Sequence, residues 1–345
     1  MEKERNRFVD IMRGVAMLLV VLGHTVTGCT EGAKDSFLYN IIWSLQMPLF
    51  FLISGYITRY SRGIESSADL WRYIRKRLLA YLLPWAVWSL LIRGVIFGSS
   101  DFLHVSWLLW HMDSGYWFLM SIWTISVIFG ISACLAGRAV QQPGIRRTAV
   151  TLALYLAGMA VLAGIGLAAG FSFLAIKLTL YYMPFYFAGY LYGQYRDRLL
   201  ETSWGPRALD AVVAVSLGAW LLILTRVRLF ELQDNGMAVL LRAFASVAGC
   251  AAVCGLGKGL FTVGGGRSRG AAFLCWCGEH SLEIYLTHYL LLDLLRPEAL
   301  PSVSSVQGIV LTAGNFALTT ALTVLAVRLT EPSKALRLLL YGKRE

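Results

Sequence analysis

Long apolar stretches alternate with short polar segments along the whole 345-residue chain. Ten of these stretches are roughly 20 residues long, enough for a helix to cross a hydrocarbon core of about 30 Å. The longest segments between them, 59–77 and 98–115, are shorter than the roughly 50 residues that a separate domain needs. The pattern predicts one all-α integral membrane domain over residues 1–345, with about ten transmembrane helices and no soluble extracytoplasmic domain. The predicted spans are 9–27, 37–58, 78–97, 116–135, 148–169, 173–193, 208–225, 237–256, 273–295 and 306–329.

Charged residues make up only 15% of the chain, against about 25% in a typical soluble protein. The formal net charge of +11 does not indicate nucleic-acid binding, because Lys and Arg form short clusters between apolar stretches and share no face. If the N-terminus is cytoplasmic, the inner segments hold 22 Lys and Arg residues and the outer loops hold four. The positive-inside rule then predicts that both termini are cytoplasmic.

The first apolar stretch carries three ionisable residues, Asp10, Arg13 and His24. Such groups are costly inside a membrane and usually face a cavity, so they favour a functional helix over a simple anchor. Arg13 and His24 fall within about 20° of the same helix face, about 16 Å apart along the axis. Asp10 can pair with Arg13 but lies about 21 Å from His24, whose partner must therefore come from another helix. Snorkelling of Arg13 to the headgroups is the simpler alternative.

Val26–Cys29 imitates a lipoprotein cleavage site. A removed signal peptide is disfavoured, because its apolar region would not contain Arg13 and His24.

The ninth apolar stretch supplies candidate partners for His24. Glu279 and Glu283 are one helical turn apart, and His288 reaches a depth similar to that of His24 if this helix runs outwards. We predict that Glu283 and His288 belong to the catalytic site. Glu279 and His280 have an equally simple alternative place in the cytoplasmic interface.

Two further groups of cations are candidates for binding. Arg72, Arg75, Lys76 and Arg77 precede the third span, where they serve as a positive-inside signal or bind the phosphates of a nucleotide cofactor. Towards the outer ends of their spans lie Arg93, Lys177 and Arg242, which either snorkel or form an electropositive pocket for an anionic acceptor. The aromatic and polar loop 98–115, which contains His111, is a candidate mouth for a substrate on the outer side. The six cysteines show no metal-binding spacing, and we expect no metal.

Several motifs together resemble the membrane acyltransferase 3 family, in the form found in sugar O-acetylases such as fucose 4-O-acetylase-like proteins. The first is Phe8-Val9-Asp10 with Arg13-Gly14 and His24, and the second is the stretch from Gln46 to Tyr56. Gln46 stands where sugar O-acetylases often have His, and Ala80 stands where a second basic residue often follows Arg77. The supporting matches are Arg77 leading to Pro84, Tyr116–Leu119, Pro184–Gly193 and Ser281–His288.

The resemblance implies transfer of an acyl group, usually acetyl, from a cytoplasmic coenzyme A thioester to a hydroxyl of a cell-envelope glycan or a lipid-linked sugar. It implies that Arg13 and His24 are essential, and that Gln46, Tyr56 and Trp117 line the substrate site. It also implies a multi-pass protein of a bacterial plasma membrane, in contact with lipids. On this reading Arg13 and the basic cluster hold the phosphates of acetyl-CoA. His24 then acts as a general base, or else forms an acyl-imidazole.

Two other function classes fit the same residues. Buried charges and Pro-kinked helices also mark the substrate path of a transporter or flippase, which would release no free coenzyme A. A sensor that keeps the fold without chemistry is disfavoured by the intact Arg13 and His24. Whether the donor is acetyl or succinyl, and whether the protein forms a homodimer, are left open by the sequence.

Overall fold

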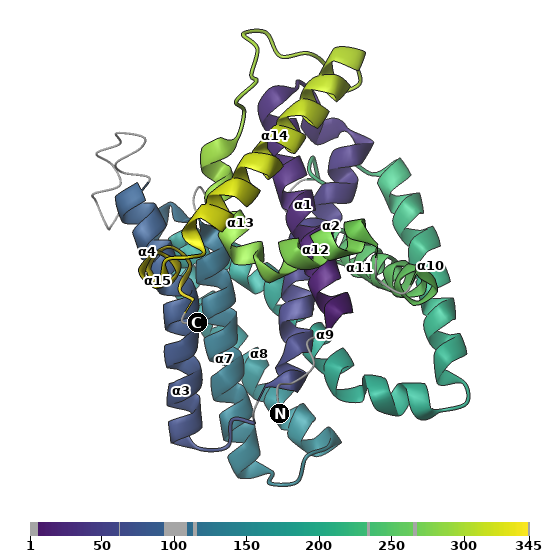
Figure 1. The fold of residues 1–345 in the computed structure, drawn as a ribbon. Coiled ribbons are helices and arrows are strands. Elements are labelled where there is room, and N and C mark those ends of the chain that lie inside the picture. Colours follow the sequence, from purple (N-terminus) through teal and green to yellow (C-terminus); the bar gives the residue numbers. More distant parts are fainter. Residues whose placement is uncertain are drawn as a thin grey trace. The chain divides into compact units, whose positions relative to one another are not determined.

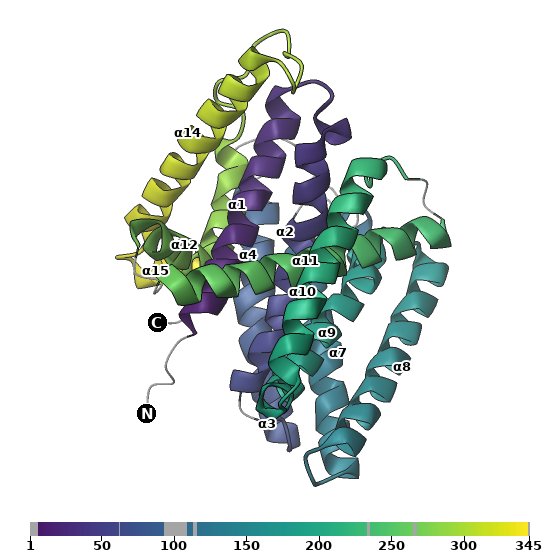
Figure 2. The ribbon, with the colours of Figure 1, turned by 90° about the vertical axis from the view of Figure 1, so that its right-hand side faces the viewer.

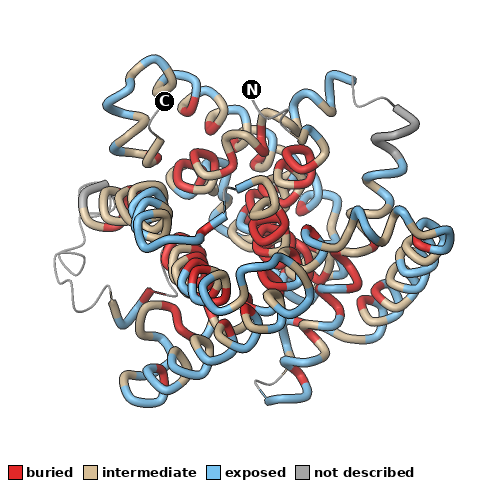
Figure 3. The backbone as a smooth tube through the Cα atoms, turned by 90° about the horizontal axis from the view of Figure 1, so that it is seen from below, coloured by how far each residue is buried: buried red, intermediate tan, exposed pale blue. Residues whose placement is uncertain are grey.

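The computed structural model describes residues 6–61, 63–92, 109–112, 116–232, 235–264 and 268–343. These residues form helices joined by short loops, and the extended pairing among them is one isolated bridge between Glu31 and Ser302. The predicted all-α class is therefore confirmed. Many helices show buried positions along one side and exposed positions along the other (Figure 3).

The chain divides into two compact units. The first unit comprises residues 1–54 and 191–329, and the second comprises residues 55–190 and 330–345. The chain passes from one unit to the other within α2 (Phe37–Tyr56), within α9 (Ile176–Glu201), and at the end of α14 (Val306–Thr330).

The first unit contains the N-terminal helix and most of the C-terminal half. Besides parts of α2 and α9, its elements are α1 (Arg7–Cys29), α10 (Gly205–Arg226), α11 (Gly236–Gly264), α12 (Arg269–Glu279), α13 (Ser281–Thr287), the short helix η8 (His288–Leu291) and α14. The short helices α12 and α13 lie against α1 (Figure 1). The long helix α11 crosses α1 at a steep angle (Figure 2).

The second unit holds the middle of the chain. A continuous helical run covers residues 67–92, through α3 (Ser67–Arg77), η3 (Leu78–Leu82), α4 (Leu83–Ala86) and η4 (Val87–Ile92). The other elements are η2 (Ile57–Tyr60), α7 (Trp117–Ala139), α8 (Ile145–Ala169), η7 (Phe173–Ala175) and α15 (Lys334–Tyr341).

Seven helices among the described residues are long and apolar enough to cross a membrane, by length and composition. They are α1, α2 continued through η2, α7, α8, α10, α11 and α14. The predicted spans 78–97, 173–193 and 273–295 are not among them, so the number of ten and the side of each terminus stay predictions. Segment 78–97 lies partly outside the described residues, and segment 173–193 covers η7 and most of the more polar α9.

The predicted ninth span is broken into α12, α13 and η8. The backbone at His280 leaves helical geometry, with φ −105° and ψ 22°, and α13 starts directly afterwards. α12 lies very close to α1, because Gly14 faces the Leu274 carbonyl and Gly278 faces the Asp10 carbonyl. A Cβ atom at either glycine would collide with those carbonyls. Small residues that allow backbones to approach in this way are typical of helix contacts in membranes.

Candidate functional site

His24 and His288 come together in the first unit. α1 carries His24, and η8 carries His288 directly after α13. Their ring centroids are 5.5 Å apart, and the ring of Tyr289 is 5.4 Å from that of His24. His288 is only 1% exposed, whereas His24 has an open side. The ninth segment thus supplies a residue next to His24.

A backbone carbonyl fixes the orientation and the tautomer of His288. Its Nδ1 lies 2.9 Å from the Ile284 carbonyl oxygen. Because a carbonyl can only accept, Nδ1 must carry the hydrogen, and the lone pair then lies on Nε2. Nε2 is buried and has no hydrogen-bond partner among the described residues. His288 therefore offers a hydrogen-bond acceptor in the interior of this unit. Glu283, the other predicted residue of this segment, is 3% exposed on α13.

Gln46 lies beside the residue that precedes His24. A Cβ atom at Gly23 would be 3.1 Å from the Gln46 Oε1, so the amide oxygen rests against the backbone of α1. This oxygen is buried and has no hydrogen-bond partner among the described residues. Gln46 is thus a predicted substrate residue that lies near His24, and its Oε1 is available to accept a hydrogen bond.

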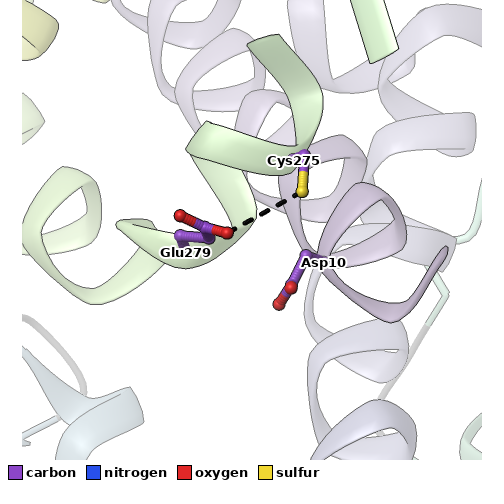
Figure 4. Close-up of side chains that lie close together, drawn as sticks. All are labelled: Asp10, Cys275 and Glu279. Carbon is purple, nitrogen blue, oxygen red and sulfur yellow. Dashed lines mark hydrogen bonds between the residues drawn. The ribbon is translucent and has the colours of Figure 1, made fainter. Parts of the chain in front are cut away.

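Near the N-terminal end of α1, Asp10 lies close to Cys275 and Glu279 of α12 (Figure 4). One ligand atom from each of the three residues lies within 4.8 Å of the others, and the Cys275 thiol donates to Glu279 Oε1 at 3.9 Å. Asp10 is 4% exposed. A thiolate and two carboxylates could hold a divalent cation such as Zn²⁺, with water as a fourth ligand. The sequence could not reveal this group, because its members are paired only by the crossing of α1 and α12. Arg13, the residue that the sequence predicts as the partner of Asp10, lies one helical turn further along α1.

The basic cluster of the second unit divides into two parts. Arg72, Arg75 and Lys76 are exposed on α3, and Arg72 pairs with Asp69 at 3.1 Å. Arg77 turns inwards, donates to the Tyr81 hydroxyl at 2.8 Å, and lies 5.1 Å from the ring of Tyr73. The three exposed cations are suited to binding a polyanion. Arg77 instead contacts the side chains of Tyr73 and Tyr81.

Apart from Arg242, the remaining predicted substrate residues that the structure describes belong to the second unit. In the second unit Trp117 stacks on Tyr182 at 5.6 Å, and the Tyr56 hydroxyl lies 3.4 Å from that of Tyr60. His111 is exposed in the short described segment 109–112. Arg93 lies outside the described residues, and Lys177 belongs to the second unit.

Arg242 serves the loop that follows α10. Its side chain is buried, its Nε donates to the Leu229 carbonyl at 3.0 Å, and its Nη2 donates to the Leu232 carbonyl. Asn40 of α2 holds the same loop, since its Nδ2 donates to the Val227 carbonyl at 2.8 Å. The Arg242 guanidinium thus stabilises the conformation of this loop through hydrogen bonds to its backbone carbonyls.

A cavity of about 500 Å³ lies at the C-terminal end of α1, next to that loop. Thr27, one turn beyond His24, is part of its wall. Lys34 lies over the ring of Phe230 at 4.9 Å. A side-chain hydrogen bond with Asp35 raises the pKa of the Glu231 carboxyl, while Arg228 opposes this rise. With three carboxylates and one Lys, the cavity is acidic. Its lining residues are Thr27, Thr30, Glu31, Gly32, Ala33, Lys34, Asp35, Phe230 and Glu231.

A family model described as an acyltransferase domain matches residues 6–328, and thus reaches into both units. The chain belongs to the acyltransferase 3 family. The protein is therefore a multi-pass membrane acyltransferase. No curated protein and no solved structure matches the chain.

This acyltransferase also has buried polar residues that sequence reasoning missed. α14 buries Thr312, Asn315, Thr319 and Thr323 along one face. Their spacing of three or four residues in an apolar helix was a usable signal, because it places all of them on one side. Asp293, in the loop after η8, has a positive φ of 58° and gave no such signal.

Proposed function

We propose that this acyltransferase transfers an acetyl group from cytoplasmic acetyl-CoA to a hydroxyl of a cell-envelope glycan or lipid-linked sugar, in a bacterial plasma membrane. The observation that carries the proposal is the pair His24 and His288, with ring centroids 5.5 Å apart in a membrane acyltransferase. An imidazole with a pKa near neutrality is well suited to removing a proton from a hydroxyl.

In the proposed reaction, His24 takes the proton of the acceptor hydroxyl. The hydroxyl oxygen attacks the thioester carbonyl carbon, the new C–O bond forms and the C–S bond breaks. The proton on His24 then passes to the thiolate, so that free coenzyme A leaves. His288 Nε2, as a fixed acceptor beside His24, supports the protonated imidazole that forms between these steps.

The donor enters from the cytoplasmic end of α1 in this proposal. Arg13 binds the phosphate end of acetyl-CoA, and the axial distance of about 16 Å to His24 suits the extended arm between the phosphates and the thioester. Exposed Arg72, Arg75 and Lys76 add positive charge on the cytoplasmic side. Asp10 holds Arg13 in place, as its spacing of three residues allows.

The test is acetyl transfer by the purified protein in lipid nanodiscs. Coenzyme A release is measured with a thiol reagent, and acetylation of isolated envelope glycans is measured by mass spectrometry. His24→Ala is expected to lower turnover by about 100-fold or more, the usual worth of a general base. Arg13→Ala is expected to raise the KM for acetyl-CoA. Val215→Ala, at a position 72% exposed on α10, is the folded control.

Two results would overturn the proposal. A wild-type protein that releases no coenzyme A would favour a transporter or flippase. Retained transfer in both His24→Ala and Arg13→Ala would remove these residues from the site.

A further inference from the structure

We propose that Asp293 and Asn315 form a subsite that binds hydroxyl groups of an uncharged sugar acceptor, at the outer end of the His24 face of α1. This inference rests on the proposed function. It specifies the residues that bind the acceptor and predicts that the acceptor is uncharged. Asp293 follows η8, and Asn315 lies on α14, both in the first unit.

Asp293 is held in a backbone conformation that costs free energy. Its φ of 58° is positive, a region that residues other than glycine rarely adopt. α14 fixes the chain on both sides of it: Thr319 donates to the Leu291 carbonyl at 2.9 Å, and Asn315 Oδ1 accepts from the Leu295 N–H at 3.0 Å. Strain that the surroundings maintain in this way is typical of functional positions.

The Asp293 carboxylate lies directly over Gly28 of α1. A Cβ atom at Gly28 would collide with both of its carboxylate oxygens. Gly28 is four residues beyond His24, which corresponds to about 40° around the helix and about 6 Å along it. The missing side chain at Gly28 therefore makes room for a carboxylate one turn outward of the catalytic imidazole.

Two buried atoms of this group have unused hydrogen-bonding capacity. Asp293 Oδ1 and Asn315 Nδ2 are buried and have no hydrogen-bond partner among the described residues. Asn315 is fully buried, and it also lies near the Cys29 thiol. Buried polar groups in native proteins are nearly always satisfied, and an unsatisfied one is especially costly in a membrane. A ligand that satisfies both must offer a donor to Asp293 and an acceptor to Asn315.

Neighbouring oxygens on a sugar ring meet this requirement. A hydroxyl donates to the carboxylate, and the next hydroxyl or the ring oxygen accepts from the amide. An anionic sugar such as a uronic acid would be repelled by Asp293. Arg296 is the cation that acts on Asp293, and the nearby cavity at the end of α1 carries three carboxylates against one Lys. The charge around the outer end of α1 therefore selects an uncharged acceptor.

The test compares acceptor use with acceptor-independent hydrolysis of acetyl-CoA. Envelope glycan is separated by anion exchange into neutral and acidic fractions, and each is titrated against the protein in nanodiscs. Wild type is expected to acetylate the neutral fraction. Asp293→Asn keeps a residue that tolerates positive φ, and it is expected to raise the KM for neutral glycan about tenfold, the usual worth of one hydrogen bond to a charged group. Acceptor-independent release of coenzyme A should stay within about twofold of wild type.

Two further variants separate binding from folding. Asp293→Gly relieves the backbone strain, so it should melt no lower than wild type and still lose affinity for the neutral glycan. Gly28→Ala should displace the carboxylate and have the same effect on KM. Matched controls are Glu298→Gln, an exposed acid in the same loop, and Gly218→Ala, a glycine of α10 where an added Cβ would have no neighbouring atom within 4 Å.

The proposal fails if Asp293→Asn leaves the KM for neutral glycan unchanged, which would leave water as the occupant. It also fails if the variant loses coenzyme A release in parallel, or if wild type prefers the acidic fraction. Failure of the proposed function looks different, because wild type would then release no coenzyme A from acetyl-CoA.

Discussion

At the scale of single residues, the orientation of His288 is the most consequential feature. The Ile284 carbonyl determines which nitrogen carries the hydrogen, and the other nitrogen is buried in a ring whose centroid is 5.5 Å from that of His24. A group that supports a protonated His24 would lower the energy of the transition state more than that of bound substrate.

We therefore predict that His288→Phe, which keeps an aromatic ring but removes both nitrogens, lowers kcat by about 10- to 100-fold with little change in the KM for acetyl-CoA. Steady-state release of coenzyme A measures both constants. The exposed α10 variant Thr225→Val serves as the control. A His288→Phe protein with wild-type kcat would show that His288 only packs beside His24.

The candidate site was predictable from the sequence only in part. His24 and Arg13 are identifiable because ionisable residues are rare in apolar helices, and His288 follows from its expected depth. Asp293 lies in a loop, where no periodicity applies, and its positive φ comes from hydrogen bonds to a helix that starts more than ten residues later. Contacts of that kind depend on the tertiary structure, so the sequence alone could not predict them.

At the scale of secondary-structure elements, the close crossing of α1 and α12 determines which residues of the two helices meet. Gly14 and Gly278 face backbone carbonyls, which cannot move aside as a flexible side chain can. The crossing also brings Asp10 next to Cys275 and Glu279. Hydropathy predicted one continuous ninth helix here, because a break at His280 does not change the apolar character of the segment.

We predict that Gly278→Ala lowers the free energy of unfolding by about 1–3 kcal/mol, the usual cost of overpacking. Thermal melting in detergent measures this change, and Gly14→Ala should behave in the same way. Gly218→Ala has open space around the new methyl group, so it should be neutral or slightly stabilising. Equal melting temperatures for Gly278→Ala and Gly218→Ala would contradict the close backbone contact.

At the scale of the whole molecule, the family match reaches into both compact units, so the acyltransferase domain is not restricted to the unit that carries His24. The helical class and the membrane character were predictable, because hydropathy and charge report them directly. The division into two units was not, since the chain changes units inside continuous helices where composition does not change.

The orientation in the membrane decides which substrate meets which end of α1. The predicted excess of basic residues in the cytoplasmic segments puts Arg13 near the inside, and His24, Gly28 and Asp293 towards the outside. Glu31→Cys, in the exposed loop after α1, should therefore react with a membrane-impermeant maleimide added to intact spheroplasts. Glu65→Cys, whose wild-type side chain is 71% exposed before α3, should react only after lysis. Labelling is measured by mass spectrometry, with the wild type and its six cysteines as the background. The reverse pattern would place the proposed acceptor subsite on the cytoplasmic side, and would require the acetyl-CoA phosphates to bind at the C-terminal end of α1, where the cavity is acidic.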